Sequence, residues 1–358
     1  MVHLLLTLAA LVATPAAPAS QVHLVQPRPY ELWDGRVRGT AAPGTVVRLS
    51  AAGRTWLVPA GADGRVDSLL ARVPLGDARL LVSGGAHAPV YGVPTGSIRP
   101  LPAATVDAAL CRRLAALAHL ATPHVSIYSR SAGGRLAAYN AGAEFEAAST
   151  LKLPIMLLTL AKNHEEPSTS GIWDAMERIT RYSDNAAANE LLERDGGSDE
   201  TGAAEMVELM RSLGLRHTYM AGGYLLDSGG GASPFGIADP PPAAYKHTTA
   251  ADMAELAGML VAAVAGQGPL VRRGVDAHEA RELLYLMVHA QDAGLVPAGS
   301  GRWPVAHKIG WLDDADDDVA IVFAPRGPFV IAIYTNGVED GTAQVFGSAA
   351  VGAVIRAG

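Results

Sequence analysis

Ser149 and Lys152 stand three residues apart at the start of an apolar run, "STLKLPIMLLTLA". The spacing of its apolar residues predicts a helix over 150–163, and positions i and i+3 share one face of a helix. The lysine amine could then take the proton of the serine hydroxyl, provided that burial or nearby positive charge lowers its pKa. The alternative is an N-cap serine beside a solvated lysine, because a Ser-x-x-Lys pair arises by chance about once in such a chain.

A second polar group, Ser183, Asp184 and Asn185, begins a predicted helix over 184–194. Ser, Asp and Asn are all favoured at helix N-caps, so one interpretation is simply another cap. The functional interpretation gives Ser183 a role in proton relay and Asn185 a hydrogen bond to a substrate amide.

A third group, Lys308, Ile309 and Gly310, lies in "VAHKIGW", which has the pattern of a β-strand. A lysine there would place positive charge near an anionic group of a substrate. Gly310 would let a ligand approach the backbone closely, because glycine has no Cβ. An ordinary edge strand is the alternative interpretation.

These three motifs occur in the order in which class A β-lactamases and penicillin-binding proteins carry their active-site residues, and the chain resembles that superfamily of serine hydrolases. The resemblance extends to "ITRYSDNAAANELL" and "HTTAADMAELAGML" and covers residues 104–358. It implies an α+β fold of the β-lactamase/transpeptidase type. In that fold an antiparallel sheet is closed by both termini of the domain and carries a helical subdomain.

The resemblance also implies roles for individual residues. Ser149 forms the acyl-enzyme, Lys152 is its base, and Ser183 relays a proton to the leaving nitrogen. The backbone N–H groups of Ser149 and Trp311 form the oxyanion hole. The substrate is a small-molecule β-lactam or an acyl peptide, and no metal ion or organic cofactor is implied. The residues that would bind the substrate are Asn185, Lys308, Gly310 and Trp311.

Three departures from the family pattern bear on activity. Ser183 follows Ser149 by only 34 residues, so a trimmed helical subdomain and a more open cleft are expected. Ile309 replaces the Thr or Ser whose hydroxyl would bind the carboxylate of a β-lactam, a loss of about 1–3 kcal/mol. No glutamate occurs between Glu208 and Glu255, where the family carries its deacylating glutamate.

The missing glutamate leaves Asp227, Asp239 or no residue as the deacylating base. Since general-base help is worth about 10²–10⁴-fold, slow deacylation is expected. The prediction is therefore a β-lactamase-type hydrolase with weakened turnover. Two alternatives stay open: a D-Ala-D-Ala carboxypeptidase or esterase-like hydrolase, and a non-catalytic penicillin-binding or sensor protein that is acylated once.

Composition and charge exclude several other classes of protein. The chain has 358 residues, enough for two domains, and 49% of them are hydrophobic, enough for a substantial core. A net charge of −7 without a basic patch argues against a nucleic-acid partner. The single cysteine, Cys111, excludes an internal disulfide and is expected to be a packed core thiol.

The N-terminus predicts export. An apolar run over 4–13 ends in Ala17-Pro18-Ala19, which fits the cleavage site of a signal peptide spanning 1–19. The run is too short to cross a bilayer, and later apolar stretches are interrupted by charge or glycine. The mature protein is therefore expected to be secreted or periplasmic, without an integral membrane span.

Two domains are expected after the signal peptide. Residues 21–100 alternate with a period of two, which predicts a small β-sandwich similar to bacterial immunoglobulin-like modules. Association with the cell wall through this module is a further expectation, and 94–103 is the predicted linker. The second domain, 104–358, has strands near both ends of a helical middle. Its middle helices are expected at 150–163, 171–181, 184–194, 202–213, 249–265 and 276–289.

Two further motifs carry weaker hypotheses. "LLDSGGG", which contains Ser228, is similar to the Asp-Ser-Gly-Gly of trypsin-like proteases, but it lies in a helical region and is predicted to be a glycine loop. Five aspartates in 311–320 could hold calcium, yet they lack the spacing of an EF-hand and are expected in a solvated hairpin turn. His307 is expected to be an ordinary strand residue.

Overall fold

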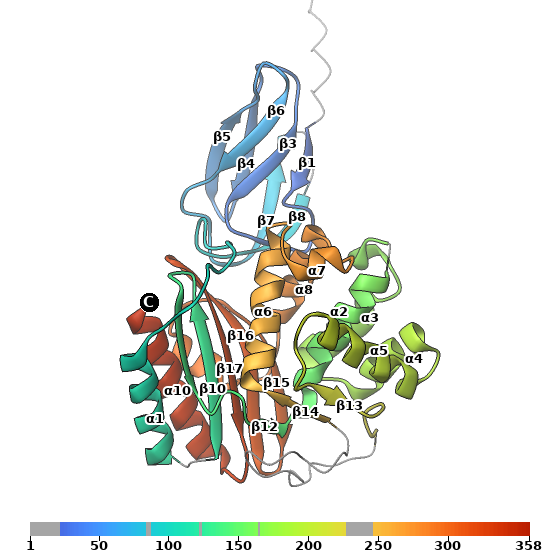
Figure 1. Cartoon of the computed structure of the whole chain (residues 1–358). Helices are drawn as coiled ribbons and strands as arrows, with labels where there is room; N and C mark the ends of the chain where they lie inside the picture. The colour runs from blue at the N-terminus through green and yellow to red at the C-terminus, as the bar shows by residue number, and fades with distance from the viewer. Residues whose placement is uncertain (1–21, 84–86, 122–123, 164, 227–245) are drawn as a thin grey trace, which may run out of the picture.

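The N-terminal part of the molecule is an all-β module of two sheets (Figure 1). The computed structural model describes residues 22–83, 87–121, 124–163, 165–226 and 246–358, so the predicted signal peptide lies outside the described residues. The smaller sheet has the order β1 (His23–Gln26), β3 (Arg36–Thr40) and β6 (Arg65–Leu69). The larger sheet has the order β2 (Glu31–Trp33), β8 (His87–Gly92), β7 (Gly76–Val82), β4 (Val46–Ala51) and β5 (Arg54–Pro59).

Alternating apolar side chains fill the space between these two sheets. Val37 and Val66 from the smaller sheet share one buried core with Leu49 and Leu80 from the larger sheet. Such burial is the dominant favourable term in folding, and here it joins the two sheets face to face. The β-sandwich predicted for residues 21–100 is confirmed.

A six-stranded sheet forms the centre of the second part of the chain. Its order is β15 (Val305–Leu312), β16 (Ala315–Ala324), β17 (Gly327–Thr335), β10 (Val125–Ser131), β11 (Arg135–Tyr139) and β9 (Thr105–Val106). All neighbours are antiparallel except β9, which is parallel to β11. Because β10 pairs with β17, strands from the two ends of the domain meet in the sheet, and this confirms the predicted α+β fold.

The period-two alternation of β16 divides the core into two layers. Ala320 and Val322 face one buried cluster with α1 (Ala108–Ala121), α9 (Leu295–Ser300) and α10 (Asp340–Ala357). Val319 and Ile321 face a larger cluster that contains the other helices. These are α2 (Lys152–Lys162), α3 (Trp173–Tyr182), α4 (Asn185–Gly196), α5 (Asp199–Ser212), α6 (Ala250–Val264), α7 (Pro269–Arg272) and α8 (Ala277–Met287).

Three short elements complete the region between the sheet and the helices. They are β12 (Glu144–Glu146), β14 (Lys246–Thr249) and β13 (Tyr219–Met220), which pair in that order. Two single-turn 3₁₀ helices, η1 (Ala148–Leu151) and η2 (Pro167–Thr169), precede α2 and α3. Because η1 follows β12 directly, the three-stranded sheet of β12, β14 and β13 fixes the position of Ser149 near the start of the helical segment.

The β-module and the second domain share part of one core. Leu32 of β2 and Val93 belong to the buried cluster that contains the helices α2 to α8. Ile98 and Leu101 pack against the same cluster, so the predicted linker, 94–103, is a packed connection. The predicted domain limits at 100 and 104 fall in this stretch, which has no regular secondary structure, and they stay predictions.

One expectation for the aspartates of 311–320 is wrong. Asp313 and Asp314 form the turn between β15 and β16, but the other three lie in β16. Asp317 and Asp318 are buried, and Asp318 accepts the N–H of Val296 at 2.8 Å. A solvated turn therefore describes only the first two of the five. Among the described residues, no helix is long and apolar enough to cross a membrane.

Candidate active site

Ser149 lies in η1 at a strained point of the backbone. Ala148, immediately before it, has φ +42°, in the left-handed region that non-glycine residues rarely occupy. Such strain costs about 1–3 kcal/mol and persists only where the surroundings hold it. Here Tyr224 holds it, because its hydroxyl donates a hydrogen bond to the carbonyl oxygen of Ala148 at 3.1 Å.

Lys152 is fully buried and its amine lies at the centre of the predicted site residues. Its Nζ is 2.9 Å from Ser149 Oγ, 2.5 Å from the carbonyl oxygen of Ser183 and 2.6 Å from Asn185 Oδ1. A neutral amine has two N–H donors and one lone pair. The carbonyl and amide oxygens only accept, so they take both N–H groups and leave the lone pair for the hydroxyl proton of Ser149.

Burial is the main reason that the pKa of Lys152 falls to about 6, and the charges of Lys308 and Lys246 add to it. At neutral pH the amine is therefore uncharged. The alternative interpretation of a solvated lysine is wrong, and the geometry is that of a serine beside its base.

Ser183 connects the two buried lysines. It ends α3 with φ +54°, a second left-handed residue in the site, and this turn brings its hydroxyl back toward Lys152. Its Oγ is 3.3 Å from Lys152 Nζ and 2.8 Å from Lys308 Nζ. A proton can therefore pass along this hydroxyl between Lys152 and a group bound in front of it.

The helix cap and the functional residue of the second motif are different residues. Asp184 is the N-cap of α4, and its carboxylate accepts the N–H of Ala187 at 3.0 Å. Asn185 instead points at Lys152, and its Nδ2 donates to the carbonyl oxygen of Leu225 at 2.9 Å. That second bond fixes which end of the Asn185 amide faces the lysine.

The third motif lies on β15, an edge strand of the six-stranded sheet. Lys308 is buried with 1% exposure and directs its amine to Ser183. A Cβ at Gly310 would lie 3.0 Å from the Ala148 side chain, so a larger residue at 310 would push β15 and η1 apart. Trp311 is 50% exposed at the outer end of the motif.

Three residues of the site were not predicted from the sequence: Tyr224, Lys246 and Glu146. The aromatic ring of Tyr224 lies between two amines, with Lys152 Nζ 4.4 Å and Lys246 Nζ 4.3 Å from its centroid. Glu146, on β12, is buried, and burial raises its pKa to about 7. No short motif contains these residues. The pairing of β12 with β14 brings Glu146 and Lys246 together, and the backbone N–H of Tyr224 is held by Asn189 Oδ1.

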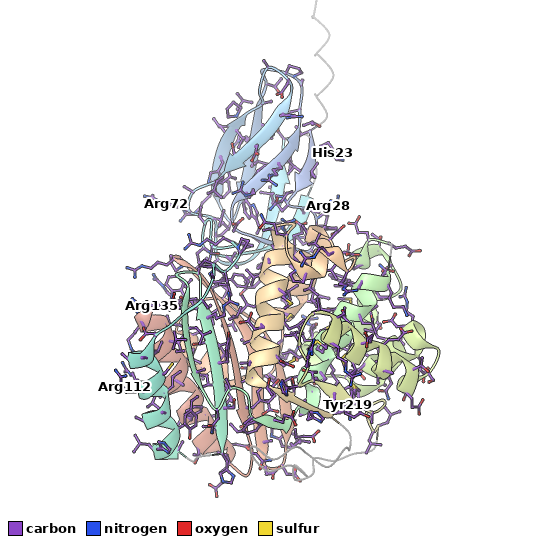
Figure 2. All side chains as sticks on the ribbon, viewed as in Figure 1. His23, Arg28, Arg72, Arg112, Arg135 and Tyr219 are labelled. Atoms are coloured by element: carbon purple, nitrogen blue, oxygen red, sulfur yellow. The ribbon has the colours of Figure 1, made fainter. Side chains whose placement is uncertain are left out.

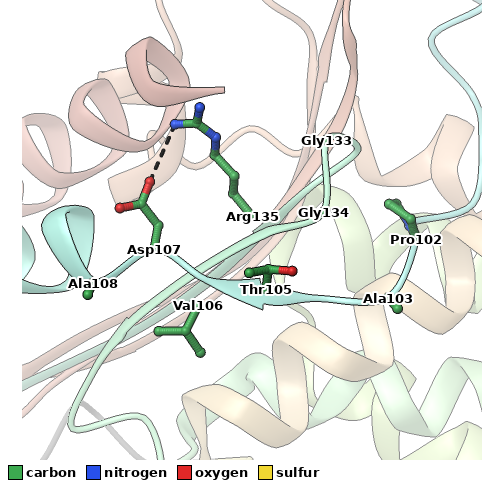
Figure 3. Close-up of a pocket in the computed structure, with 9 residues that line it drawn as sticks. All are labelled: Pro102, Ala103, Thr105, Val106, Asp107, Ala108, Gly133, Gly134 and Arg135. Carbon is green, nitrogen blue, oxygen red and sulfur yellow. Dashed lines mark hydrogen bonds and ion pairs between the residues drawn. The ribbon is translucent and has the colours of Figure 1, made fainter.

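Other predicted residues lie apart from this centre. His307 is buried with its Nδ1 3.2 Å from Asp318 Oδ1, a structural pair rather than a group that contacts Lys152. Cys111 packs partly buried on α1, as expected. Asp227, Ser228 and Asp239 lie outside the described residues. A surface hollow is lined by residues from 102–108 and from 133–135, among them the ion pair of Asp107 and Arg135 (Figure 3). None of the predicted site residues lies in this hollow.

The acylation rate is expected to follow a bell-shaped pH profile. Below about pH 6 Lys152 is protonated and cannot accept the proton of Ser149, so the rate rises as pH increases through that value. Burial lowers the pKa of Lys308 to about 8, so its positive charge is lost above that pH and the rate falls again. Measuring adduct formation from pH 5 to pH 10 checks this profile. A single rise near pH 10 would contradict it, because an unperturbed lysine titrates there.

One family model matches the second part of the chain. The family model described as "Beta-lactamase enzyme family" matches residues 162–356, a range that includes Ser183 and Lys308. No curated protein matches the chain in sequence.

Solved structures share the fold at low sequence identity. The structure of PBP-A is 21% identical with a TM-score of 0.56, and the match covers 72% of this chain and 98% of that one. A class A β-lactamase from Mycobacterium abscessus is 21% identical with a TM-score of 0.54, covering 69% and 98%. A β-lactamase from Desulfarculus baarsii is 22% identical with a TM-score of 0.55, covering 69% and 97%. Since the family model spans more than half of the chain, this protein belongs to the β-lactamase enzyme family.

Proposed function

We propose that this protein is an exported serine hydrolase that reacts with β-lactams through an acyl-enzyme on Ser149. The observation that carries the proposal is the buried amine of Lys152. It lies 2.9 Å from Ser149 Oγ, and two oxygen acceptors take its N–H groups. A buried lysine with this pKa and these partners is arranged to accept a proton rather than to bind a solvent-exposed anion.

Acylation would proceed as a balanced proton and bond exchange. Lys152 takes the proton of Ser149, whose Oγ attacks the β-lactam carbonyl carbon and forms a C–O bond. The C–N bond of the ring then breaks. The nitrogen receives the proton through the hydroxyl of Ser183, which lies 3.3 Å from Lys152 Nζ. The positive charge of Lys308, 2.8 Å from that hydroxyl, favours the bound anionic substrate.

Two further parts of the proposal concern the developing oxyanion and the substrate. The backbone N–H groups of Ser149 and Trp311 are the proposed oxyanion hole, with Asn185 and Gly310 beside the substrate. The close packing of β15 on η1 supports this, because Trp311 belongs to β15 and Ser149 to η1, and the packing brings their backbones together. A half-exposed Trp311 would contact the side chain of the substrate.

Slow deacylation is the second half of the proposal. The hydrogen-bond partners of Lys152 within the described residues include no carboxylate, and the ring of Tyr224 covers its amine. A mutant of PBP-A has been solved as an acyl-enzyme complex with penicillin G. If neither Asp227 nor Asp239 activates water, a long-lived adduct of the same kind is expected here.

Counting product per protein chain tests this function. With excess penicillin, a β-lactamase releases many equivalents of opened product, whereas a penicillin-binding or sensing protein gives a burst of about one equivalent. We expect the burst, followed by slow release. Failure to form any adduct would exclude β-lactams as substrates. Parallel assays with a D-Ala-D-Ala peptide and a simple ester would then separate the carboxypeptidase or esterase alternative.

Restoring a hydroxyl at position 309 should improve reaction with penicillins. Ile309→Thr supplies the donor that a β-lactam carboxylate would bind, worth about 1–3 kcal/mol, or roughly 5–150-fold in the second-order acylation constant. The acylation constant for benzylpenicillin measures this gain.

Ile309→Val is the matched control, since valine has the shape of threonine without the hydroxyl. An equal gain in both variants would assign the effect to side-chain size. A neutral ester substrate, which has no carboxylate, should show little change in Ile309→Thr.

A further inference from the structure

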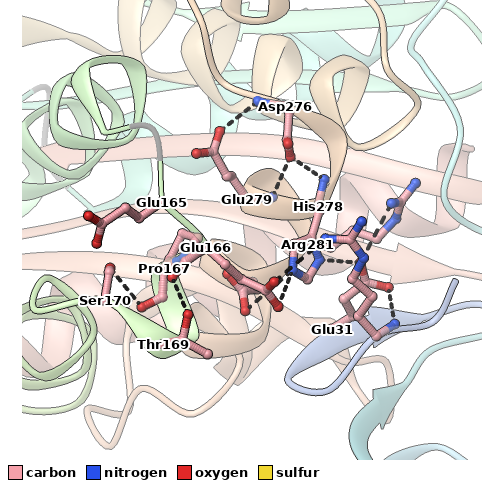
Figure 4. Close-up of polar contacts among 12 residues, drawn as sticks. Glu31, Glu165, Glu166, Pro167, Thr169, Ser170, Asp276, His278, Glu279 and Arg281 are labelled. Atoms are coloured by element: carbon pink, nitrogen blue, oxygen red, sulfur yellow. Dashed lines mark hydrogen bonds and ion pairs between the residues drawn. The ribbon is translucent and has the colours of Figure 1, made fainter. Parts of the chain in front are cut away.

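A buried polar cluster lies where the β-module meets the helices of the second domain (Figure 4). It joins four residues that are far apart in the sequence: Glu31 on β2, Glu166 before η2, and His278 and Glu282 on α8. Glu31 and Glu282 have no exposed surface, and His278 is buried. Nothing in the proposed acylation uses these residues.

His278 is held in one orientation by Glu31. Its Nδ1 lies 2.6 Å from Glu31 Oε1, a distance at which Nδ1–H donates to the carboxylate. The other ring nitrogen, Nε2, lies 3.1 Å from Glu166 Oε1 and 3.6 Å from Glu282 Oε1, and in the neutral ring it carries the lone pair that a metal ion would bind. A carboxylate that orients the distal N–H of a histidine is the usual outer partner of a metal-binding imidazole.

Glu282 lacks the partners that a buried carboxylate needs. Neither of its oxygens has a hydrogen bond of normal geometry, although weaker hydrogen bonds from the side chain and the backbone of Ser168 lower its pKa. Burial outweighs that influence and raises the pKa of Glu282 to about 7. Burying a carboxylate whose one ion-pair partner, His278, lies 3.6 Å away is costly, so this side chain points to a cation that would lie between it and His278.

The two arginines at this junction contact other members of the cluster, Glu31 and Glu166. Arg281 Nη1 is 3.7 Å from Glu31, and its Nη2 donates to the carbonyl oxygen of Val264. Arg28, labelled at this junction in Figure 2, is 3.8 Å from Glu166 on the exposed side. Neither arginine has an ion pair with Glu282.

We propose that Glu166, His278 and Glu282 bind a divalent transition-metal cation of the Zn²⁺ type, and that Glu31 positions His278 as a ligand. The three ligand atoms lie within 4.8 Å of one another. Around a tetrahedral zinc with bonds of about 2.0–2.1 Å, ligand atoms are about 3.3–3.4 Å apart. The 3.1 and 3.6 Å separations at His278 lie on either side of that value, so two of the three distances between ligand atoms fit a tetrahedral site.

A proton is the competing occupant of this cluster. Burial disfavours the imidazolium, but the hydrogen bond and charge of Glu31, together with the other two carboxylates, raise the pKa of His278. An imidazolium would satisfy the nearer Glu166 with its second N–H. Glu282 would still lack a hydrogen bond, whereas a divalent ion binds both carboxylates at once.

A bound cation would join the two parts of the chain. Glu166 and the α8 residues belong to the helical region, and Glu31 belongs to the β-module. Since the ligands are brought together only in the folded protein, the ion would stabilise it by RT ln(1 + [metal]/Kd). The expected role is therefore structural, at a distance from the acylation chemistry.

The test uses the full chain after removal of metals with EDTA. Isothermal titration with Zn²⁺ and the visible absorption of added Co²⁺ report binding and coordination. We expect one equivalent of Zn²⁺, a higher melting temperature, and a Co²⁺ spectrum of a four-coordinate site. Glu282→Gln should abolish the Co²⁺ spectrum, and Glu31→Gln should weaken binding by about 10–100-fold.

Two variants keep the test decisive. Glu166→Gln alters a ligand that is 39% exposed, so it removes binding without disturbing the core. His289→Gln is the matched control, because His289 pairs with Asp77 at 2.8 Å in a second contact between the same two parts. Three results would each overturn the proposal. They are metal binding that survives in Glu166→Gln and Glu282→Gln, an equal loss of metal binding in His289→Gln, and no metal binding to the unmodified chain.

Discussion

Replacing Lys152 with alanine is expected to lower the acylation rate by about 10²–10⁴-fold, the usual contribution of a positioned general base. The variant removes the group that lies 2.9 Å from Ser149 Oγ and leaves the serine in place. The hydroxyl of Ser149 would then have to transfer its proton to water. Stopped-flow measurement of adduct formation with a chromogenic β-lactam gives the rate.

Lys162→Ala is the matched control for this result. Lys162 lies on the same helix, but its side chain is 40% exposed and pairs with Glu205 at the surface. Its removal should leave acylation unchanged. If Lys152→Ala lowered the acylation rate by less than about tenfold, Lys152 would not be the base. Lys246, the third lysine of the site, would then be the next residue to replace.

Replacing Ser149 with alanine should have the largest effect of all, because it removes the atom that forms the acyl bond. No adduct is expected at any pH or time. The substitution removes only a hydroxyl from a residue that already lies in a short 3₁₀ helix, so the fold should persist. Thermal unfolding of the variant checks this directly.

Two residues of the site have a strained backbone that their surroundings hold in place. Ala148 and Ser183 both have left-handed dihedral angles: Ala148 directly precedes Ser149, and the carbonyl oxygen of Ser183 accepts a hydrogen bond from Lys152 Nζ. Strain of this kind is retained only when neighbouring contacts over-determine it. The Tyr224 hydroxyl on the Ala148 carbonyl is one such contact.

Much of the catalytic domain could be predicted from local sequence pattern. The helices expected at 150–163, 171–181 and 184–194 correspond to α2, α3 and α4. Their apolar spacing and caps are local signals, and Asp184 does cap α4. In the structure the three motifs lie together, because hydrogen bonds connect Lys152 to Ser183 and Asn185, and Ser183 to Lys308.

Residues that depend on long-range pairing could not be predicted. Lys246 reaches the site only because β14 pairs with β12, and Tyr224 only because its backbone bonds to Asn189 of α4. No helical or strand period marks either residue. The same reason applies to the cluster at the β-module, in which Glu31 and His278 are 247 positions apart.

Local charge was a misleading guide at β16. Three adjacent aspartates indicate a solvated turn, since charged residues are rarely buried without partners. Asp318 is nevertheless buried with both oxygens occupied, by His307 and by the N–H of Val296. Asp317 is buried opposite Gly310 on the neighbouring strand. Burial raises the pKa of Asp317 well above its usual value, which favours the protonated, uncharged carboxyl group.

Intact-protein mass spectrometry after mixing with a penicillin tests the central claim most directly. The unmodified chain should gain the mass of one penicillin, and Ser149→Ala should gain nothing under the same conditions. Persistence of the adduct for hours would agree with slow deacylation. An adduct of equal yield on Ser149→Ala, or none on the unmodified chain, would contradict the assignment of Ser149 as the nucleophile that opens β-lactams.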